Sequence, residues 1–203
     1  MEFVFVIAVL VVSVIVHEIS HGYMAERLGD PTARLAGRLT LNPLPHIDFF
    51  GSIMLPAILI LLKTGLIIGW AKPVPYNPYN MRDPRYGGAL VAAAGPLANI
   101  AIAIVFGLLI RFSSALELPD QFVVITGFVV FINIVLAFLN LLPIPPLDGS
   151  KILFAFLPYH LHYVQDFLER YGFFIVIFVF FFLWEFLLPI PSFLFRALTG
   201  VVF

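Results

Sequence analysis

The stretch FFGSIMLPAILILLKTGLIIG, residues 49–69, decides the topology of this chain. It is apolar apart from Ser52, Lys63 and Thr64, and it is long enough to cross a bilayer once as a helix. Alternatively, a helix over 49–62 could enter the membrane, turn at 63–65 and return as an extended strand over 66–70. The first arrangement gives the chain five crossings, and the second gives four crossings plus a re-entrant segment.

The composition places the whole chain in a membrane. Of its 203 residues, 62% are hydrophobic and only 11% are charged, too few charges to cover a soluble domain of this size. Stretches long enough to span a bilayer cover residues 3–28, 89–110 and 122–142. A fourth, shorter stretch covers 173–188 and is followed by an apolar tail. No basic region or cleavage site precedes the first stretch, so we expect it to be retained rather than removed as a signal peptide.

The basic residues favour the re-entrant arrangement. With five crossings, the Lys and Arg residues divide almost evenly between the two faces. With the re-entrant segment, most of them share one face, which the positive-inside rule identifies as cytoplasmic: Arg27, Arg34, Arg38, Lys72, Arg82, Arg85, Lys151 and Arg170. Only Arg111 and Arg196 lie on the opposite face, and Lys63 lies near the turn. We therefore predict about four spanning helices plus a re-entrant segment over 49–69.

Two segments between the first two spans are predicted to be extended. GRLTLNP (37–43) alternates like a strand, and the prolines in GWAKPVPYNPYN (69–80) disfavour a helix. The predicted fold class is therefore an all-α polytopic membrane protein with short membrane-associated β segments. We expect residues 1–203 to form one integral-membrane domain, with a core over 1–155 and apolar C-terminal segments over 156–203.

The chemistry of the chain is concentrated in VIVHEISHGY, residues 14–23, inside the first span. His17 and His21 are four residues apart, so both imidazoles leave one face of a helix and can bind one zinc ion. Glu18 can then act as the base that activates water. Polar groups at this depth are costly, which favours a functional role over a buried polar cluster that only holds helices together.

A catalytic zinc ion needs a third protein ligand. The prolines of NLLPIPPLDGSK (140–151) must unwind the end of the third long span, and Asp148 follows them. With the re-entrant segment, Asp148 lies on the same face as the end of the first span. We interpret His46, His160 and His162 as structural or interfacial residues instead.

Five motifs together resemble the site-2 protease family of intramembrane zinc metalloproteases, in a compact form without PDZ or CBS domains. The resemblance covers residues 5 to about 155, in the family's order: HEISHGYMAERLGD (17–30), GRLTLNPLPHID (37–48), GWAKPVPYNPYN (69–80), AAAGPLANI (92–100) and FLNLLPIPPLDG (138–149). It implies one zinc ion per chain held by His17, His21 and Asp148, with Glu18 activating water. It also suggests that Asn99 and Asn140 position the substrate, although an interhelical hydrogen bond is the alternative for both asparagines.

The function implied is hydrolysis of peptide bonds within the transmembrane segments of membrane protein substrates, for regulated intramembrane proteolysis or signal-peptide clearance. The alternative is a membrane metal-binding or transport protein that uses the same ligands without cleaving. A non-cleaving scaffold and a prenyl-protein protease are weaker rivals. The expected partners are a transmembrane substrate and the lipid bilayer, and a net charge of −1 argues against nucleic acid. We expect the plasma membrane of a prokaryote, with the active site nearer the cytoplasmic face.

Overall fold

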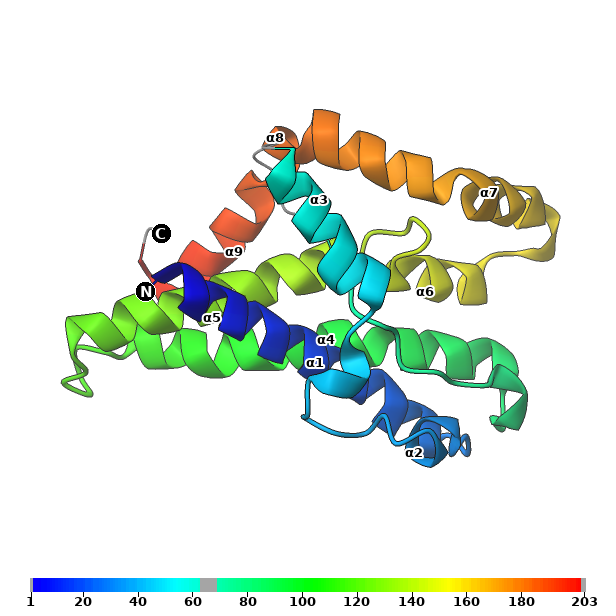
Figure 1. Ribbon diagram of the computed structural model, residues 1–203, viewed down its shortest axis with the longest axis horizontal. Coiled ribbons are helices and arrows are strands. Elements are labelled where there is room, and N and C mark those ends of the chain that lie inside the picture. Colours follow the sequence, from blue (N-terminus) through cyan, green and yellow to red (C-terminus); the bar gives the residue numbers. More distant parts are fainter. Residues whose placement is uncertain (1, 63–68, 202–203) are drawn as a thin grey trace.

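The computed structural model describes residues 2–62 and 69–201. They form helices joined by short loops and by one long extended segment (Figure 1). In chain order the helices are α1 (Glu2–Arg27), α2 (Thr32–Leu35), the 3-10 turn η1 (Leu44–His46), the π-helical η2 (Phe49–Met54), α3 (Leu55–Leu61), the 3-10 turn η3 (Pro78–Asn80), α4 (Pro84–Arg111), α5 (Asp120–Asn140), α6 (Asp148–Phe156), the 3-10 turn η4 (Tyr159–Leu161), α7 (His162–Phe178), the π-helical η5 (Val179–Leu183), α8 (Trp184–Leu187) and α9 (Pro189–Thr199).

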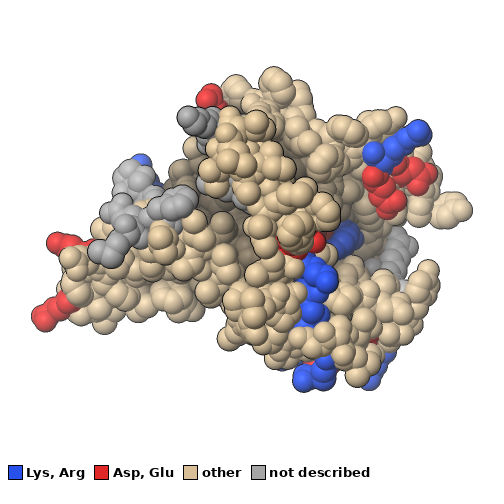
Figure 2. Space-filling view, in the orientation of Figure 1, with Lys and Arg blue, Asp and Glu red and all other residues tan. Residues whose placement is uncertain are grey.

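Four helical stretches are long and apolar enough to span a membrane, which confirms the predicted number. They cover Val4–Arg27, Tyr86–Arg111, Asp120–Asn140 and Tyr159–Leu187. α4 packs against both α1 and α5, and the three helices lie side by side in Figure 1. The surface over them is largely uncharged in Figure 2, and most visible Lys and Arg side chains gather toward the right of that view. This distribution is that of a membrane-embedded bundle with one basic end.

The bundle has two buried apolar clusters. One lies where α9 meets α4 and α5, and it comprises Ala103, Ile110, Val130, Ile134 and Phe195. The other joins α1 to the start of α4, and it comprises Ala25, Met81 and Val91. Between them, the facing sides of α1, α4 and α5 carry polar residues.

The two ends of the segment over 49–69 lie next to each other. Its helical part, Phe49–Leu61, is too short to span a bilayer and runs away from the bundle as η2 and α3. The backbone N–H of Trp70 donates to the carbonyl of Gly51 at 3.2 Å, so the two ends of the segment are adjacent. This contact is the one expected of a re-entrant segment. The predicted turn at 63–65 and most of the predicted strand at 66–70 lie outside the described residues.

The predicted β segments are wrong: no strand occurs among residues 2–62 and 69–201. Residues 37–43 are bent, and a ring nitrogen of His46 donates to the carbonyl of Thr40 at 2.9 Å. Residues 69–77 are extended (Figure 1), but the N–H groups of Trp70, Lys72, Val74 and Asn77 bond to loops and side chains rather than to a neighbouring strand. Prolines 73 and 75, which have no N–H, prevent a regular ladder there.

The last span begins earlier than predicted, at Tyr159 instead of 173. The polar residues after 159 belong to the same helix, in which Gln165 donates to Glu169 at 2.8 Å one turn later. At Pro189 the chain turns into α9, which folds back against α4 and α5. There Arg111 donates to the carbonyl of Ala197 at 2.8 Å and joins the ends of α4 and α9.

Candidate metal centre

His17, His21 and Asp148 meet in the interior of the protein. The two imidazoles leave the same face of α1, with ring centroids 4.7 Å apart. The Asp148 Oδ2 atom lies 3.1 Å from Nε2 of His17 and 3.1 Å from Nε2 of His21. All three residues are buried, and one ligand atom from each lies within 4.8 Å of the others. No other such group of three His, Asp or Glu residues occurs in the described part of the chain.

Asp148 reaches the histidines because the chain unwinds after α5 and α6 begins at this residue. Gly149 allows the tight approach of α6 to the end of α5, since a Cβ at this position would lie 2.3 Å from the Leu141 carbonyl oxygen. Lys151, one turn further along α6, places its Nζ 3.5 Å from the other carboxylate oxygen, Oδ1. The carboxylate therefore faces the histidines with one oxygen and a cation with the other.

The hydrogen bond at Nδ1 of each imidazole bears on the protonation of Nε2, the ring nitrogen that faces Asp148. The Nδ1 atom of His21 lies 2.6 Å from the carbonyl of Val91, which can only accept, so this nitrogen carries the proton. The Nδ1 atom of His17 lies 2.6 Å from Oδ1 of Asn99. If each ring carries its proton at Nδ1 alone, both Nε2 lone pairs face the Asp148 carboxylate, and a cation between these atoms would bind all three groups.

A zinc ion fits this position. Tetrahedral zinc with ligands at 2.0–2.1 Å separates its ligand atoms by about 3.3 Å, close to the 3.1 Å separations found here. Two imidazole nitrogens and a carboxylate oxygen are ligands that zinc prefers. Both imidazoles also have the N–H acceptors that orient metal-binding histidines in proteins.

Gly95 on α4 makes room for the site. A Cβ at this position would lie 2.5 Å from Nε2 of His17 and 2.6 Å from Cε1 of His21. Any larger residue would therefore displace both rings. Pro96, the next residue, lies inside α4 and is also buried.

Glu18 is held by the extended segment at 69–77. The backbone N–H of Val74 donates to Glu18 Oε2 at 2.9 Å. The segment is itself fixed by Arg38, whose guanidinium donates to the carbonyl of Lys72 at 2.7 Å and more weakly to that of Pro73. Glu18 thus follows His17 on the helix and has a defined carboxylate orientation.

Beyond the membrane end of α1, Asp30 anchors the other end of the same segment. This fully buried carboxylate accepts from the N–H of Asn77 at 2.6 Å, from the Asn80 amide at 2.8 Å and from Thr32. Burial alone would raise the pKa of Asp30, but these hydrogen bonds outweigh burial and hold it below its ordinary value. Asp30 is therefore ionised at neutral pH.

The two asparagines singled out by the sequence lie in different surroundings. Asn99 is fully buried against His17. Asn140 is half-buried at the end of α5 and donates to the carbonyl of Leu136 in its own helix at 2.9 Å. Sequence reasoning missed Asn133, which is fully buried beside Asn99. Its signal was present, because an amide in the middle of an apolar span is costly without a partner.

The other histidines lie apart from this cluster. His46 is buried in its loop and bonds to Thr40, while His160 and His162 lie at the start of the last span, on η4 and α7. None of them belongs to the metal-ligating group in the described residues.

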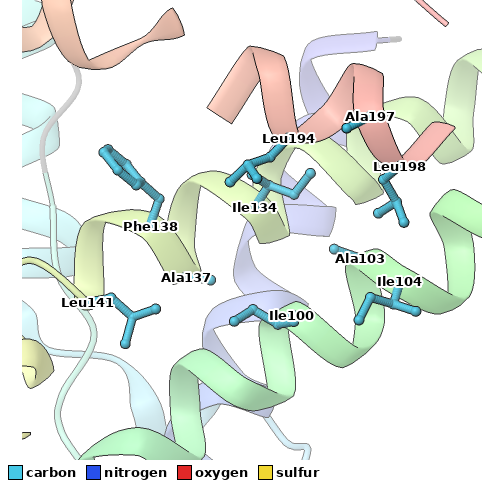
Figure 3. Close-up of a pocket in the computed structure, with 10 residues that line it drawn as sticks. All are labelled: Ile100, Ala103, Ile104, Ile134, Ala137, Phe138, Leu141, Leu194, Ala197 and Leu198. Atoms are coloured by element: carbon cyan, nitrogen blue, oxygen red, sulfur yellow. The ribbon is translucent and has the colours of Figure 1, made fainter. Parts of the chain in front are cut away.

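Two cavities adjoin the bundle. One, of about 510 Å³, is lined partly by Tyr76, Lys151, Tyr159 and His162, and its Lys151 also contacts Asp148. The other, of about 500 Å³, lies between α4, α5 and α9 and has only apolar lining residues, including Ile100, Ala103 and Ile134 (Figure 3).

Comparisons with known proteins identify the family. Residues 117–183 match the description of Peptidase family M50. The chain is 38% identical over 185 residues to "Putative zinc metalloprotease YwhC" of Bacillus subtilis, covering 86% of this chain and 80% of that protein. The chain is thus a membrane-embedded zinc metalloprotease by class. It belongs to peptidase family M50, the site-2 protease family.

Other relatives have similar names. "Putative zinc metalloprotease Rip2" of Mycolicibacterium smegmatis is 36% identical over 149 residues, which are 72% of this chain and 55% of that protein. "Putative zinc metalloprotease MJ0611" of Methanocaldococcus jannaschii is 40% identical over 91 residues, 43% of this chain and 46% of that protein. Among solved structures there is no significant match.

Proposed function

We propose that this protein hydrolyses peptide bonds within the transmembrane segments of membrane protein substrates, with zinc held by His17, His21 and Asp148. The observation that carries the proposal is the convergence of two Nε2 atoms on Asp148 inside a bundle of spanning helices. A site at this depth serves a substrate that is itself in the membrane. Regulated intramembrane proteolysis and signal-peptide clearance are the processes that need such a reaction.

Bound zinc supplies a Lewis acid that acidifies water and polarises the scissile carbonyl. Glu18 takes the proton from the attacking water and later delivers it to the leaving amine. The Val74 N–H, 2.9 Å from Oε2, keeps one carboxylate oxygen engaged and leaves the other for the proton. We propose that water reaches Glu18 from the cavity beside Lys151, on the basic and therefore cytoplasmic face of the bundle.

A transmembrane substrate must unwind locally, because the carbonyls of a helix are already hydrogen-bonded. Pairing with an extended segment of the enzyme offsets that loss. In the segment at 69–76, the N–H groups of Trp70, Lys72 and Val74 and the carbonyl of Lys72 already have partners. Residues 37–43 are bent, and the N–H groups of Gly37, Arg38 and Asn42 also have partners there. Leu39 of this segment lies against Gly22, the residue next to His21.

Zinc content and peptide-bond cleavage, measured on the purified wild type and Glu18→Gln with a transmembrane reporter, test the proposal. We expect zinc in both proteins and cleavage by the wild type alone, with activity of the variant lower by at least about 1000-fold. Cleavage by Glu18→Gln at the wild-type rate would exclude Glu18 as the base. Zinc in both proteins with cleavage by neither, across a panel of substrate segments, would favour the metal-binding or transport alternative.

A further inference from the structure

A chain of polar side chains crosses the interior of the bundle behind His17. Asn99 on α4 accepts from Nδ1 of His17 at 2.6 Å and donates through Nδ2 to Oδ1 of Asn133 on α5, at 2.8 Å. Asn133 in turn donates through its own Nδ2 to the carbonyl of Val129 at 2.8 Å and to the hydroxyl of Ser13 at 2.9 Å. Three spanning helices therefore contribute to one connected hydrogen-bond path.

All four side chains of this path are buried. Asn99 and Asn133 have no exposed surface, Ser13 is 4% exposed and His17 is 5% exposed. Interhelical hydrogen bonds in membranes contribute only about 0.6 kcal/mol on average, so helix association alone is a weak reason to bury two amides. The direction of the hydrogen bonds supplies a stronger one.

An asparagine amide can fit a space in two orientations related by a 180° flip, and its neighbours decide between them. The carbonyl of Val129 can only accept, so the NH₂ group of Asn133 must face it. That leaves Oδ1 of Asn133 facing Asn99, which must present its own NH₂ group there. Asn99 consequently presents Oδ1 to His17, and the ring must donate from Nδ1.

Both histidines thus donate from Nδ1, but to different kinds of acceptor. His21 donates directly to a backbone carbonyl, that of Val91, whose direction is fixed by α4. His17 has a side-chain acceptor instead, Asn99. The Asn99 NH₂ group faces two acceptors, Oδ1 of Asn133 at 2.8 Å and the carbonyl of Ser13 at 3.4 Å, and the shorter bond to Asn133 is the stronger constraint on its orientation. The path through Asn133 ends, like that of His21, on a backbone carbonyl.

We propose that Asn133 is a positioning residue of the metal centre, acting with Ser13 through Asn99 to direct the unprotonated Nε2 of His17 toward Asp148. The inference rests on the proposed function, since it takes His17 as a zinc ligand. Asn133 touches neither the metal position nor the substrate. Its contribution is to select one orientation of the Asn99 amide and hence one orientation of the His17 ring.

The first test is zinc affinity, measured by chelator competition on the purified protein. Asn133→Leu keeps the volume but removes both hydrogen-bonding groups, and we expect zinc affinity to fall by about 10- to 100-fold, as for other partners of metal ligands. The matched control is Thr126→Val, an isosteric change at another buried polar position of α5. It should change zinc affinity by less than about 2-fold. Equal effects of the two changes would overturn the proposal.

The second test separates positioning from packing. Asp at position 99 accepts from His17 in either orientation, so Asn99→Asp should make the site independent of Asn133. In an Asn99→Asp background, we expect Asn133→Leu to change zinc affinity by less than about 3-fold. A loss as large as in the wild-type background would assign Asn133 a structural role only.

The third test is made on the zinc-loaded wild type. NMR of ¹⁵N-histidine should show protected imidazole protons for His17 and His21, assigned by His17→Ala and His21→Ala, beside that of the buried His46. An unprotected Nδ1 proton of His17 would overturn the inference even if Asn133→Leu did not fold. Retention of stoichiometric zinc by His17→Ala would instead contradict the proposed ligand set, so the two failures are distinguishable.

Discussion

The same two helices, α4 and α5, build two very different interiors. On the side that faces α1, Gly95 lies against the rings of His17 and His21, Asn99 bonds to His17, and Asn133 bonds to Asn99. On the side that faces α9, the lining residues are all apolar and border an open cavity of about 500 Å³. Asn99 and Ile100 are neighbours in sequence, yet each belongs to a different side.

This contrast shows how a helix is patterned when its solvent is lipid. Mean hydropathy hardly distinguishes the sides, because α4 and α5 are apolar nearly all round. A few small or polar residues on one face create the site, and their partners come from other helices rather than from water. Substitutions on the polar side should therefore affect zinc, whereas substitutions on the apolar side should not.

Among substitutions on the polar side, Gly95→Ala should reduce zinc affinity the most. The added Cβ would lie 2.5–2.6 Å from atoms of both histidine rings, so the rings must move away from Asp148. We expect zinc affinity to fall by more than about 100-fold, with the helical content unchanged. Zinc affinity by chelator competition and circular dichroism on the same samples test this.

The matched control for that prediction is Gly88→Ala, in the same helix. A Cβ at Gly88 has no atom within 4 Å, so the alanine should leave zinc binding unchanged and favour the helix slightly. Zinc binding by Gly95→Ala at the wild-type affinity would show that the close approach of α4 is not required.

Asp30→Asn should have an intermediate effect, which falls on stability. Asp30 lies just beyond the C-terminal end of α1. The amide cannot accept all the hydrogen bonds that the carboxylate receives from Thr32, Asn77 and Asn80. We expect a loss of about 2 kcal/mol in stability at neutral pH, seen as a lower midpoint of thermal unfolding in detergent.

The same substitution has a defined pH dependence. The folded-state pKa of Asp30 lies below its ordinary value of 3.8, so its contribution is complete well above pH 3.8 and is lost as the pH falls through the folded-state value. The stability difference between the wild type and Asp30→Asn should therefore shrink on acidification below about pH 4. A difference that stays constant there would mean that the carboxylate charge is not involved.

Ala197→Leu should have the smallest effect, because it adds volume to the apolar cavity from α9. The cavity has room for the larger side chain, and no candidate ligand lines it. Zinc affinity should stay within about 2-fold of the wild type. A large loss of zinc would show that α9 is coupled to the site and would weaken the division between the two sides.

Much of the architecture could be predicted because apolar length is a local signal. The spans, the i, i+4 histidines and the unwinding before Asp148 each follow from one stretch of sequence. The convergence of Asp148 on the histidines needed one further step, the topology of residues 49–69. The hydrogen bond between Trp70 and Gly51 agrees with the arrangement that the basic residues favour.

The misses have physical causes too. The predicted β segments at 37–43 and 69–80 failed because alternation and prolines indicate extended backbone but not a partner strand. The side chains of Arg38, Glu18 and Asp30 supply the partners instead. The role of Asn133 depends on the register of α5 against α1 and α4, which no single stretch of sequence contains.

The contact between Val74 and Glu18 also limits which insertions and deletions the segment around residue 74 can accept. Val74 stands between Pro73 and Pro75, so it is the one residue of the three with a backbone N–H to donate. A deletion or insertion that shifted the segment by one residue in either direction would present a proline to Glu18. The two prolines thus fix the register of this segment against Glu18, and a change in its length should disturb the contact more than a change of side chain at position 74.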